Sequence, residues 1–347
     1  MTMALMDMQI EELEALLKER GQPAFRARQL FNWLSKGTPL EQMSNLPLEL
    51  REKLKEYPLG GAGIYSRLVS RLDGTRKYLF SLMDGNIIEG VLMKYNYGNT
   101  LCISSQVGCR MGCAFCASTL EGLVRNLTPG EMYGQVVSVN NELRLEGERE
   151  ISHIVIMGSG EPLDNFDNLI KFLRLVNCPD GLNIGMRNIT VSTCGLAEKI
   201  EELARLKLNV TLSVSLHAPE DSLRRTIMPI ANKYPLERLI EAARYYIRET
   251  GRRVTFEYIL LDGVNDSREH ARRLRGLLKG MQCHVNLIRM NAVSERALNG
   301  STIKRAQAFK DELDSLNISC TIRREMGRDI NGACGQLRRQ TIKGGNV

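Results

Sequence analysis

The chain has few of the residues and segments that mark zinc, secreted or membrane proteins. It contains only four histidines, and its cysteine motif has no second C-x2-C pair elsewhere, so the usual ligand patterns of zinc sites are missing. No apolar run reaches the ~18 residues of a membrane span, and the first twenty residues lack a basic start followed by a long apolar stretch. Nine cysteines without a secretion signal are typical of thiols, metal ligands or catalytic groups rather than of disulfides. We therefore expect a cytoplasmic protein that does not bind membranes.

Composition and charge set the scale of the fold and suggest a partner. With 43% hydrophobic and 25% charged residues, the 347 residues can bury one large core together with a small accessory domain. The net charge is +7, and residues 321–347 carry six Lys/Arg against two Asp/Glu, whereas residues 1–60 carry a net charge of −1. We interpret the basic stretch around Cys334 as a contact for nucleic acid, with a solvated tail as the alternative.

The first 97 residues form two predicted segments. Apolar residues at helical spacing over 8–20, 24–36 and 46–56 predict a helical accessory domain, residues 1–60. Three short alternating runs follow, joined at Asp73-Gly74 and at Asp84-Gly85-Asn86, which are strong hairpin signals. Residues 61–97 are therefore predicted to form a short antiparallel β bridge.

Beyond the bridge, apolar β-branched runs alternate with helical segments. Six such strand–helix units predict an α/β fold, a partial (β/α)6 barrel over residues 98–330, in which the C-terminal strand ends line one mouth. A last run over 318–323 would lead the basic segment 331–347, with Cys334, back toward that mouth. The predicted strands are 100–105, 151–157, 187–193, 209–216, 253–260 and 283–289, and the predicted helices lie near 129–146, 165–177, 196–206, 235–250, 266–279 and 302–316.

One cysteine motif carries the strongest chemical signal. Cys109, Cys113 and Cys116 are spaced C-x3-C-x2-C, so three thiolates on one tight loop leave one metal position open. A 4Fe-4S cluster with three cysteine ligands and one free iron fits this spacing, and Phe115 before the last cysteine fits the radical S-adenosylmethionine (SAM) signature. Zinc or buried core thiols are the alternatives.

Polar residues follow several of the predicted strands. The strand HIVIMG runs into GSGEP, where Gly160 lets a backbone approach a ligand closely and Glu161 can accept a hydrogen bond from an ammonium group. Because parallel strand ends meet at one mouth, these side chains together suggest a cofactor site rather than separate turn or capping residues. The other predicted members are Ser192, Ser215, Leu216, His217 and Asn291.

Seven motifs in order extend these observations to nearly the whole chain: TLCISSQVGC, CRMGCAFCAS, MGSGEPLDN, ITVSTCG, SVSLHAP, YILLDGVND and DINGACGQL. The chain resembles the RlmN family of radical SAM methyltransferases, which act on C2 of an adenine in 23S ribosomal RNA. The resemblance implies that Cys109, Cys113 and Cys116 hold a 4Fe-4S cluster. It also implies that SAM is bound by Gly160, Glu161, Ser192, Ser215, Leu216, His217 and Asn291.

The resemblance also implies a mechanism. Cys334 matches the cysteine that is transiently methylated by a first SAM, and a radical from a second SAM removes a hydrogen from that methyl group, which then adds to C2 of the adenine. Glu89 matches the proposed proton acceptor, and Cys102 matches the thiol that attacks Cys334 and releases the product with a transient disulfide. The implied partners are adenine-2503 of 23S ribosomal RNA, with adenine-37 of transfer RNA as a second candidate, and a cellular electron donor. We expect a monomer.

Alternatives remain at this stage. A Cfr-type C8 methyltransferase shares the cluster and the positions of Cys102, Cys334 and Glu89, and a noncatalytic iron–sulfur sensor that binds RNA is the option from another class. A lone Glu on a hairpin, such as Glu89, is usually a solvated charge. We interpret the remaining cysteines as core thiols, namely Cys178, Cys194, Cys283 and Cys320.

Overall fold

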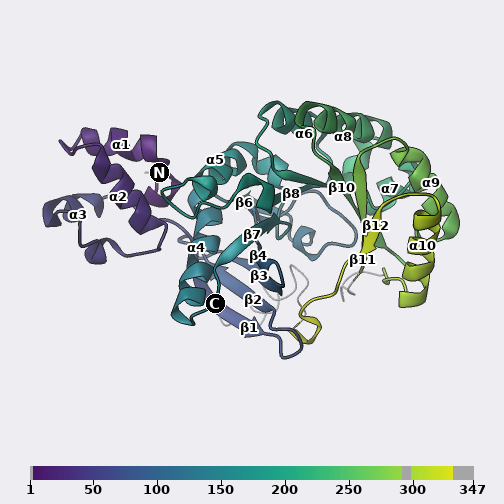
Figure 1. Ribbon diagram of the computed structural model, residues 1–347, viewed down its shortest axis with the longest axis horizontal. Helices are drawn as coiled ribbons and strands as arrows, with labels where there is room; N and C mark the ends of the chain where they lie inside the picture. Colours follow the sequence, from purple (N-terminus) through teal and green to yellow (C-terminus); the bar gives the residue numbers. More distant parts are fainter. Residues whose placement is uncertain (1–2, 291–297, 331–347) are drawn as a thin grey trace.

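The computed structural model describes residues 3–290 and 298–330. The N-terminal helices are α1 (Ile10–Lys18), α2 (Phe25–Leu34) and α3 (Leu48–Leu54), and they form a separate lobe at one end of the molecule (Figure 1). Helix α1 starts with a capping box in which Gln9 and Glu12 satisfy each other's backbone N–H groups, and it buries Leu13 and Leu17. The predicted helical N-terminal region is confirmed.

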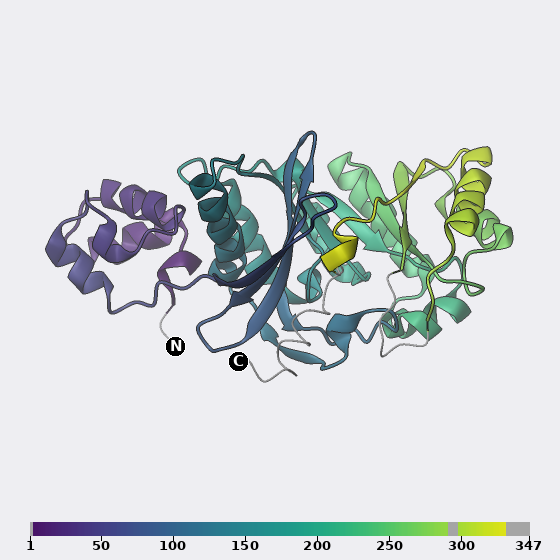
Figure 2. The same ribbon diagram turned by 90° about the horizontal axis from the view of Figure 1, so that it is seen from below.

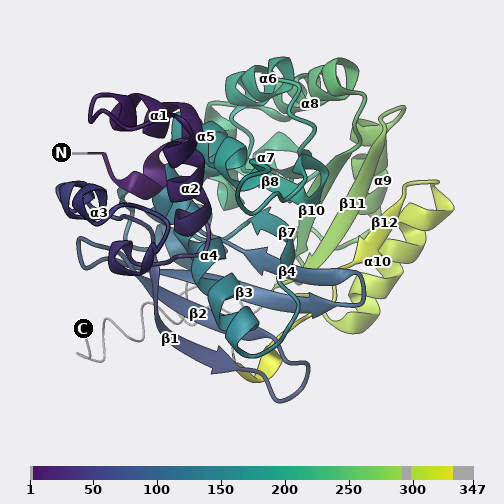
Figure 3. The ribbon, with the colours of Figure 1, turned by 60° about the vertical axis from the view of Figure 1, so that its left-hand side comes forward.

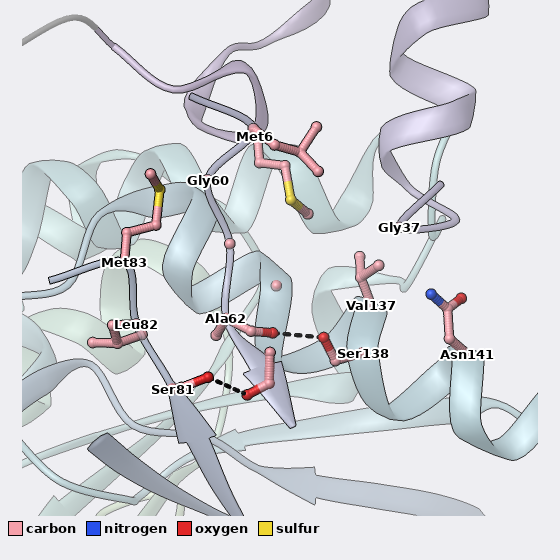
Figure 4. Close-up of a pocket in the computed structure, with 14 residues that line it drawn as sticks. Met6, Gly37, Gly60, Ala62, Ser81, Leu82, Met83, Val137, Ser138 and Asn141 are labelled. Carbon is pink, nitrogen blue, oxygen red and sulfur yellow. Dashed lines mark hydrogen bonds between the residues drawn. The ribbon is translucent and has the colours of Figure 1, made fainter. Parts of the chain in front are cut away.

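The lobe packs against α4 (Pro129–Leu145) by close backbone contact. A Cβ on Gly134 would lie 2.3 Å from the Ala62 nitrogen, so only glycine lets the linker approach this helix. Nearby, the Gly130 N–H donates to the Asp7 carboxylate at 2.7 Å, and the Ser138 hydroxyl donates to the Ala62 carbonyl at 2.6 Å. A cavity of about 330 Å³ remains at this junction (Figure 4).

One ten-stranded sheet organises the rest of the chain, in the order β1-β2-β3-β4-β7-β8-β9-β10-β11-β12. Strands β1 to β4 pair antiparallel, and from β4 onward all neighbours are parallel, so the predicted hairpin bridge continues directly into the barrel sheet (Figure 3). The strands are β1 (Gly63–Val69), β2 (Arg76–Ser81), β3 (Ile87–Tyr95), β4 (Gly98–Cys102), β7 (Ile151–Ile156), β8 (Ile189–Thr193), β9 (Thr211–Ser215), β10 (Val254–Leu260), β11 (Cys283–Arg289) and β12 (Cys320–Ile322).

Helices on the outer side of the strands complete the partial barrel (Figure 1). They bury the outward-facing apolar residues of the strands, such as Val191, Phe256 and Leu287. The predicted α/β partial barrel is confirmed, and one short helix, α7 (Asp221–Ile227), was not expected from the sequence. The crossover helices are α4, α5 (Phe166–Asn177), α6 (Ala197–Arg205), α8 (Leu236–Thr250), α9 (Arg268–Leu278) and α10 (Ile303–Ser315).

The inner side of the barrel carries buried polar side chains among apolar ones. Strand register places Ser215 beside Glu257 and Glu257 beside Asn286, and the Glu257 carboxylate accepts hydrogen bonds from Ser213 at 2.7 Å and from Asn286 at 2.9 Å. Because side chains alternate along a strand, apolar residues between these positions face the helices. The barrel can therefore enclose a polar ligand.

The last described segment crosses from β12 to the antiparallel strands (Figure 2). Gly327 N–H donates to the Asp73 carboxylate at 2.9 Å, and Asp329 accepts from the Ser70 hydroxyl at 2.6 Å and from the Arg71 N–H at 2.8 Å. These contacts bring the chain back to the β1–β2 turn five residues before Cys334, which lies outside the described residues. No helix in the described part of the chain is long and apolar enough to cross a membrane.

Candidate active site

A cavity of about 220 Å³ lies at the C-terminal ends of the barrel strands. It brings together the cysteine loop and the strand-end residues that the sequence singled out separately. Leu216 is adjacent but does not line the cavity, because its side chain belongs to the main core. Asn291 lies outside the described residues. The predicted residues that line the cavity are Cys109, Cys113, Cys116, Gly160, Glu161, Ser192, Ser215 and His217.

The cysteine loop is held in place at its base and at its tip. A small second sheet joins β5 (Gln106–Gly108) to β6 (Leu123–Asn126), and the Cys109 N–H donates to the Gly122 carbonyl at 2.9 Å. At the tip, the Ala114 N–H donates to the Ile227 carbonyl at the end of α7, at 2.8 Å. The thiols are thus presented by a loop with fixed ends.

The thiols suit a bound metal cluster. Burial raises the pKa of Cys109 to about 12 and raises the pKa of Cys113 as well, so metal binding would replace protons at both sulfurs. Among the described residues, no three His, Cys, Asp or Glu side chains converge on a point where one metal ion could bind. The three thiols instead share the wall of one cavity, and their donor type is the one that iron–sulfur clusters use. These residues fit a 4Fe-4S cluster with three protein ligands.

The GSGEP turn lies against the same cavity. Gly160 has φ +107°, and a Cβ there would lie 2.6 Å from the Gln106 side chain, so the turn requires glycine. The buried Glu161 carboxylate accepts from the Leu163 N–H at 3.0 Å and from the Cys194 N–H at 2.7 Å. Burial raises its pKa. An ammonium group on a ligand would compensate this buried carboxylate, as predicted for SAM.

His217 is buried in an unusual backbone conformation, with φ +59°. Its Nδ1 accepts a hydrogen bond from the Ile259 N–H at 3.0 Å, so the neutral ring carries its proton on Nε2. The Phe115 ring meets the imidazole edge-on, with the ring centres 4.8 Å apart. Burial lowers the pKa of His217 from 6.5 to about 3, and nearby Arg224 contributes to the shift. The imidazole is therefore a neutral donor at the cavity.

This depressed pKa predicts a pH-dependent stability. The unfolded chain takes up a proton at this histidine below pH 6.5, whereas the folded chain does not until about pH 3, so stability present above pH 6.5 is lost as the pH falls through this window. His217→Asn keeps a residue that tolerates positive φ and removes the titration. From pH 7 to pH 5, the wild type should lose about 2 kcal/mol more free energy of unfolding than His217→Asn. Urea unfolding of the cluster-free protein measures this difference.

His270→Asn offers the control, because it removes a half-buried histidine at the start of α9, outside the core, and so tests whether the effect belongs to His217 in particular. Equal pH slopes for the wild type and His217→Asn would contradict a neutral buried imidazole.

Two further predicted residues lie on the inner face of the antiparallel strands. Cys102 on β4 is opposite Val91 on β3, and Glu89 is two residues along from Val91 on the same face. Glu89 is buried with only 2% of its surface exposed, and its carboxylate lies 3.4 Å from the ammonium of Lys77, which is fully buried. The interpretation of Glu89 as a solvated hairpin charge is therefore wrong, because β3 is an interior strand of the sheet.

Cys102 is close to the cavity through shared neighbours. It packs with Val91 and Met93, and Met157 and Met326 lie against this group. Met157 also lines the cavity, so the group that contains Cys102 borders the cavity wall. Cys334, the reaction partner that the resemblance implies, lies outside the described residues, and no disulfide joins any two of the described cysteines.

The sequence did not identify several side chains of the cavity. Glu257 lines it and is buried, with a raised pKa caused by burial. Cys194, which we expected to be a core thiol, lines it too, and Arg323 contributes a cation. An acidic residue within the apolar run VTFEYIL was the available signal for Glu257, because such a residue must face inward at a polar position.

Comparisons with known proteins agree with this geometry. Residues 103–274 match the family model described as the radical SAM superfamily, and residues 3–58 match the ribosomal RNA large subunit methyltransferase N-terminal domain. The chain is 54% identical to a probable dual-specificity RNA methyltransferase RlmN of Clostridium perfringens, over 98% of this chain and 97% of the relative. A protein of the same description from Clostridium novyi is 51% identical, over 98% of both chains.

A solved structure extends the comparison to the fold. The crystal structure of a radical SAM methyltransferase from Sphaerobacter thermophilus matches with a TM-score of 0.92 at 44% identity. The match covers 96% of this chain and 98% of that one, so it includes both the N-terminal helices and the partial barrel.

Proposed function

Because the chain belongs to the RlmN family of radical SAM RNA methyltransferases, we propose that it methylates C2 of adenine-2503 in 23S ribosomal RNA and of adenine-37 in transfer RNA. The observation that carries the proposal is that a buried thiol and a buried carboxylate, Cys102 and Glu89, lie on one face of the antiparallel strands, and that the apolar group around Cys102 packs with Met157 of the cavity wall. A methyltransferase that used only a polar displacement at SAM would need neither group. The dual-specificity description of the relatives supports the second substrate.

The target atom explains the need for a radical route. C2 of adenine lies between two ring nitrogens and is electron-poor, so it is a poor nucleophile toward the sulfonium methyl of SAM. When bound, the cluster and SAM supply a radical that removes a hydrogen atom. The residues of this chain then hold the methyl carrier, orient the base and move a proton.

Cys334 is the proposed methyl carrier. The described chain ends at Ile330, after Met326 has packed against the group that contains Cys102. Ile330 is four residues before Cys334 in the sequence, and the segment before it is anchored to the antiparallel strands through Asp329. In each turnover, the Cys334 thiolate takes a methyl group from a first SAM, and a second SAM provides the radical, in a ping-pong sequence.

Glu89 and Cys102 complete the reaction after the methylene carbon has bonded to C2. The Glu89 carboxylate accepts the C2 proton, and Lys77, 3.4 Å away, offsets its negative charge in a site without water access. The adduct also gives up one electron, for which the oxidised cluster would be the acceptor. The Cys102 thiolate then attacks the Cys334 sulfur, the carbon–sulfur bond breaks, a Cys102–Cys334 disulfide forms, and the released methylene carbon takes up a proton to become the methyl group of the base. A cellular reductant must restore both thiols, and an electron donor must serve the cluster.

Nucleoside analysis tests the proposal. Deleting the gene should remove 2-methyladenosine from 23S ribosomal RNA and from transfer RNA, and re-expression of the wild-type chain should restore both. Liquid chromatography with mass spectrometry of digested RNA gives the answer, and a Cys178→Ala chain serves as the matched control, since this cysteine lies away from the cavity. The appearance of 8-methyladenosine would instead assign the chain to the C8 reaction, and modification of ribosomal RNA alone would remove the second substrate.

A further inference from the structure

The short helix α7 carries an arginine that lies entirely inside the protein. The Arg224 side chain has no exposed surface, although the next residue, Arg225, is exposed. Its guanidinium donates to four backbone carbonyls: Leu216 at 3.1 Å, Tyr234 at 3.2 Å, Cys194 at 2.8 Å and Ser215 at 3.3 Å. Three of these carbonyls belong to the loops that end β8 and β9, beside the cavity.

Arg224 has no carboxylate partner among residues 3–290 and 298–330. No ion pair of the described residues includes it, whereas Arg76, which is also mostly buried, contacts three glutamates. A buried charge with only carbonyl acceptors is costly, because neutral dipoles replace only part of the lost hydration. An arginine does not give up its proton in such a place, so its charge must find compensation in another way.

The acidic groups near Arg224 are two thiols of the cavity, Cys194 and Cys113, and the Asp221 carboxylate on the same helix, which forms no ion pair with it. Burial lowers the pKa of Arg224, and the Cys194 and Cys113 sulfurs oppose this effect when they are ionised. The helix that carries Arg224 also touches the cysteine loop directly, through the hydrogen bond from the Ala114 N–H to the Ile227 carbonyl. The cation therefore lies behind the wall that the cluster ligands form.

We propose that Arg224 is the built-in counter-charge of the iron–sulfur site, and that it favours the reduced state of the cluster. The proposal rests on the proposed function, which requires a cluster at Cys109, Cys113 and Cys116. Thiolate ligands give the site a negative charge, and reduction by one electron adds another. A fixed cation in a water-free environment stabilises the more negative state, so it raises the reduction potential.

The same side chain links the cluster wall to the cofactor turn. The Cys194 carbonyl accepts from Arg224, and the Cys194 N–H donates to the Glu161 carboxylate, so one residue is held between a buried cation and a buried anion. Glu161 is the predicted acceptor for the ammonium group of SAM. Losing the Arg224 hydrogen bonds should therefore disturb SAM binding as well, through the position of Cys194.

Variants at this position separate charge from hydrogen bonding. Arg224→Met removes both, Arg224→Gln removes the charge but keeps a donor, and Arg224→Lys keeps the charge with fewer donors. Arg225→Met on the same helix is the matched control. Each full-length protein is reconstituted anaerobically with iron and sulfide, iron content is measured, and the midpoint potential is obtained by titration with dithionite followed by paramagnetic resonance.

The expected results differ between the variants. Arg224→Met and Arg224→Gln should load iron and titrate at clearly more negative potentials, whereas Arg224→Lys and Arg225→Met should titrate near the wild type. SAM binding, measured by the change in the resonance spectrum, should weaken in all three Arg224 variants and stay normal in Arg225→Met.

Several outcomes would overturn the proposal. An unchanged midpoint potential in an iron-loaded Arg224→Met or Arg224→Gln protein would overturn it. Equal shifts of the midpoint potential in Arg224→Lys and in the neutral variants would also overturn it, because charge would then not be the cause. If neither neutral variant takes up iron, the test depends on Arg224→Lys. The proposal requires that this variant takes up iron and has the midpoint potential of the wild type. Failure of the wild type itself to bind a cluster would instead contradict the proposed function.

Discussion

Cys334→Ala should eliminate methylated adenine completely, whereas Cys102→Ala should stall with RNA covalently attached to the protein. The first change removes the methyl carrier, so no bond between protein and base can form. The second keeps the carrier but removes the thiol that breaks the carbon–sulfur bond. The structure supports this division, because Cys102 is buried on β4 in a group against which Met326, from the segment that leads to Cys334, packs.

The two variants are distinguished on a denaturing gel. Protein purified after expression is run with and without RNase, and the Cys334 peptide is then examined by mass spectrometry for an attached adenosine. A slow RNase-sensitive band should appear only for Cys102→Ala. Cys283→Ala is the matched control, because this thiol is half-buried at the far end of β11. Normal turnover by Cys102→Ala, or methyladenine formed by Cys334→Ala, would end the two-cysteine mechanism for this chain.

A third variant, Glu89→Gln, can be examined in the same assay. Glu89→Gln keeps the shape of the side chain but cannot accept the C2 proton, so the adduct should accumulate although Cys102 is present. The structure makes this variant informative, since Glu89 is buried beside Lys77 and solvent cannot replace it as a base.

Replacing any one of the three motif cysteines should abolish stable iron uptake and all methylation. Cys113→Ala is the sharpest case, because this thiol is buried and its loop is fixed to α7 through Ala114. With two motif thiolates left, a 4Fe-4S cluster loses a corner ligand. Iron and sulfide analysis after anaerobic reconstitution measures the loss, and the paramagnetic spectrum of the wild type should change when SAM is added.

Cys194 makes this experiment more specific. Its thiol lines the same cavity and interacts electrostatically with Cys113, so it is the available candidate for a fourth ligand. A radical SAM site needs one iron free for SAM, and Cys194→Ala should therefore retain the cluster. Loss of iron in Cys194→Ala would indicate a closed four-thiolate site, and an active, iron-free triple variant of the motif would contradict the whole assignment.

Local features of the sequence were sufficient for much of the fold. The six barrel strands and their crossover helices occur within a few residues of the predicted ranges, because alternation and helical spacing depend on near neighbours. The turns at Asp73 and Asp84 form as expected. The three-cysteine loop could also be recognised, since its ligands lie within eight consecutive residues. By contrast, α7 was not expected, because its sequence DSLRRTI offers only Leu223 and Ile227 as apolar residues.

Long-range packing decided the properties that matter for the chemistry. Lys77 and Glu89 meet because β2 and β3 pair in one register, and β4 pairs with the other edge of β3. No local pattern in the sequence encodes this pairing. Glu257 faces the cavity, and Arg224 is shielded from water, because other helices and strands pack around them. The sequence by itself determined which residues could bind metal, carry a methyl group or accept a proton. Only the tertiary structure decided which of them are shielded from water, and charge interactions become strong only where water is excluded.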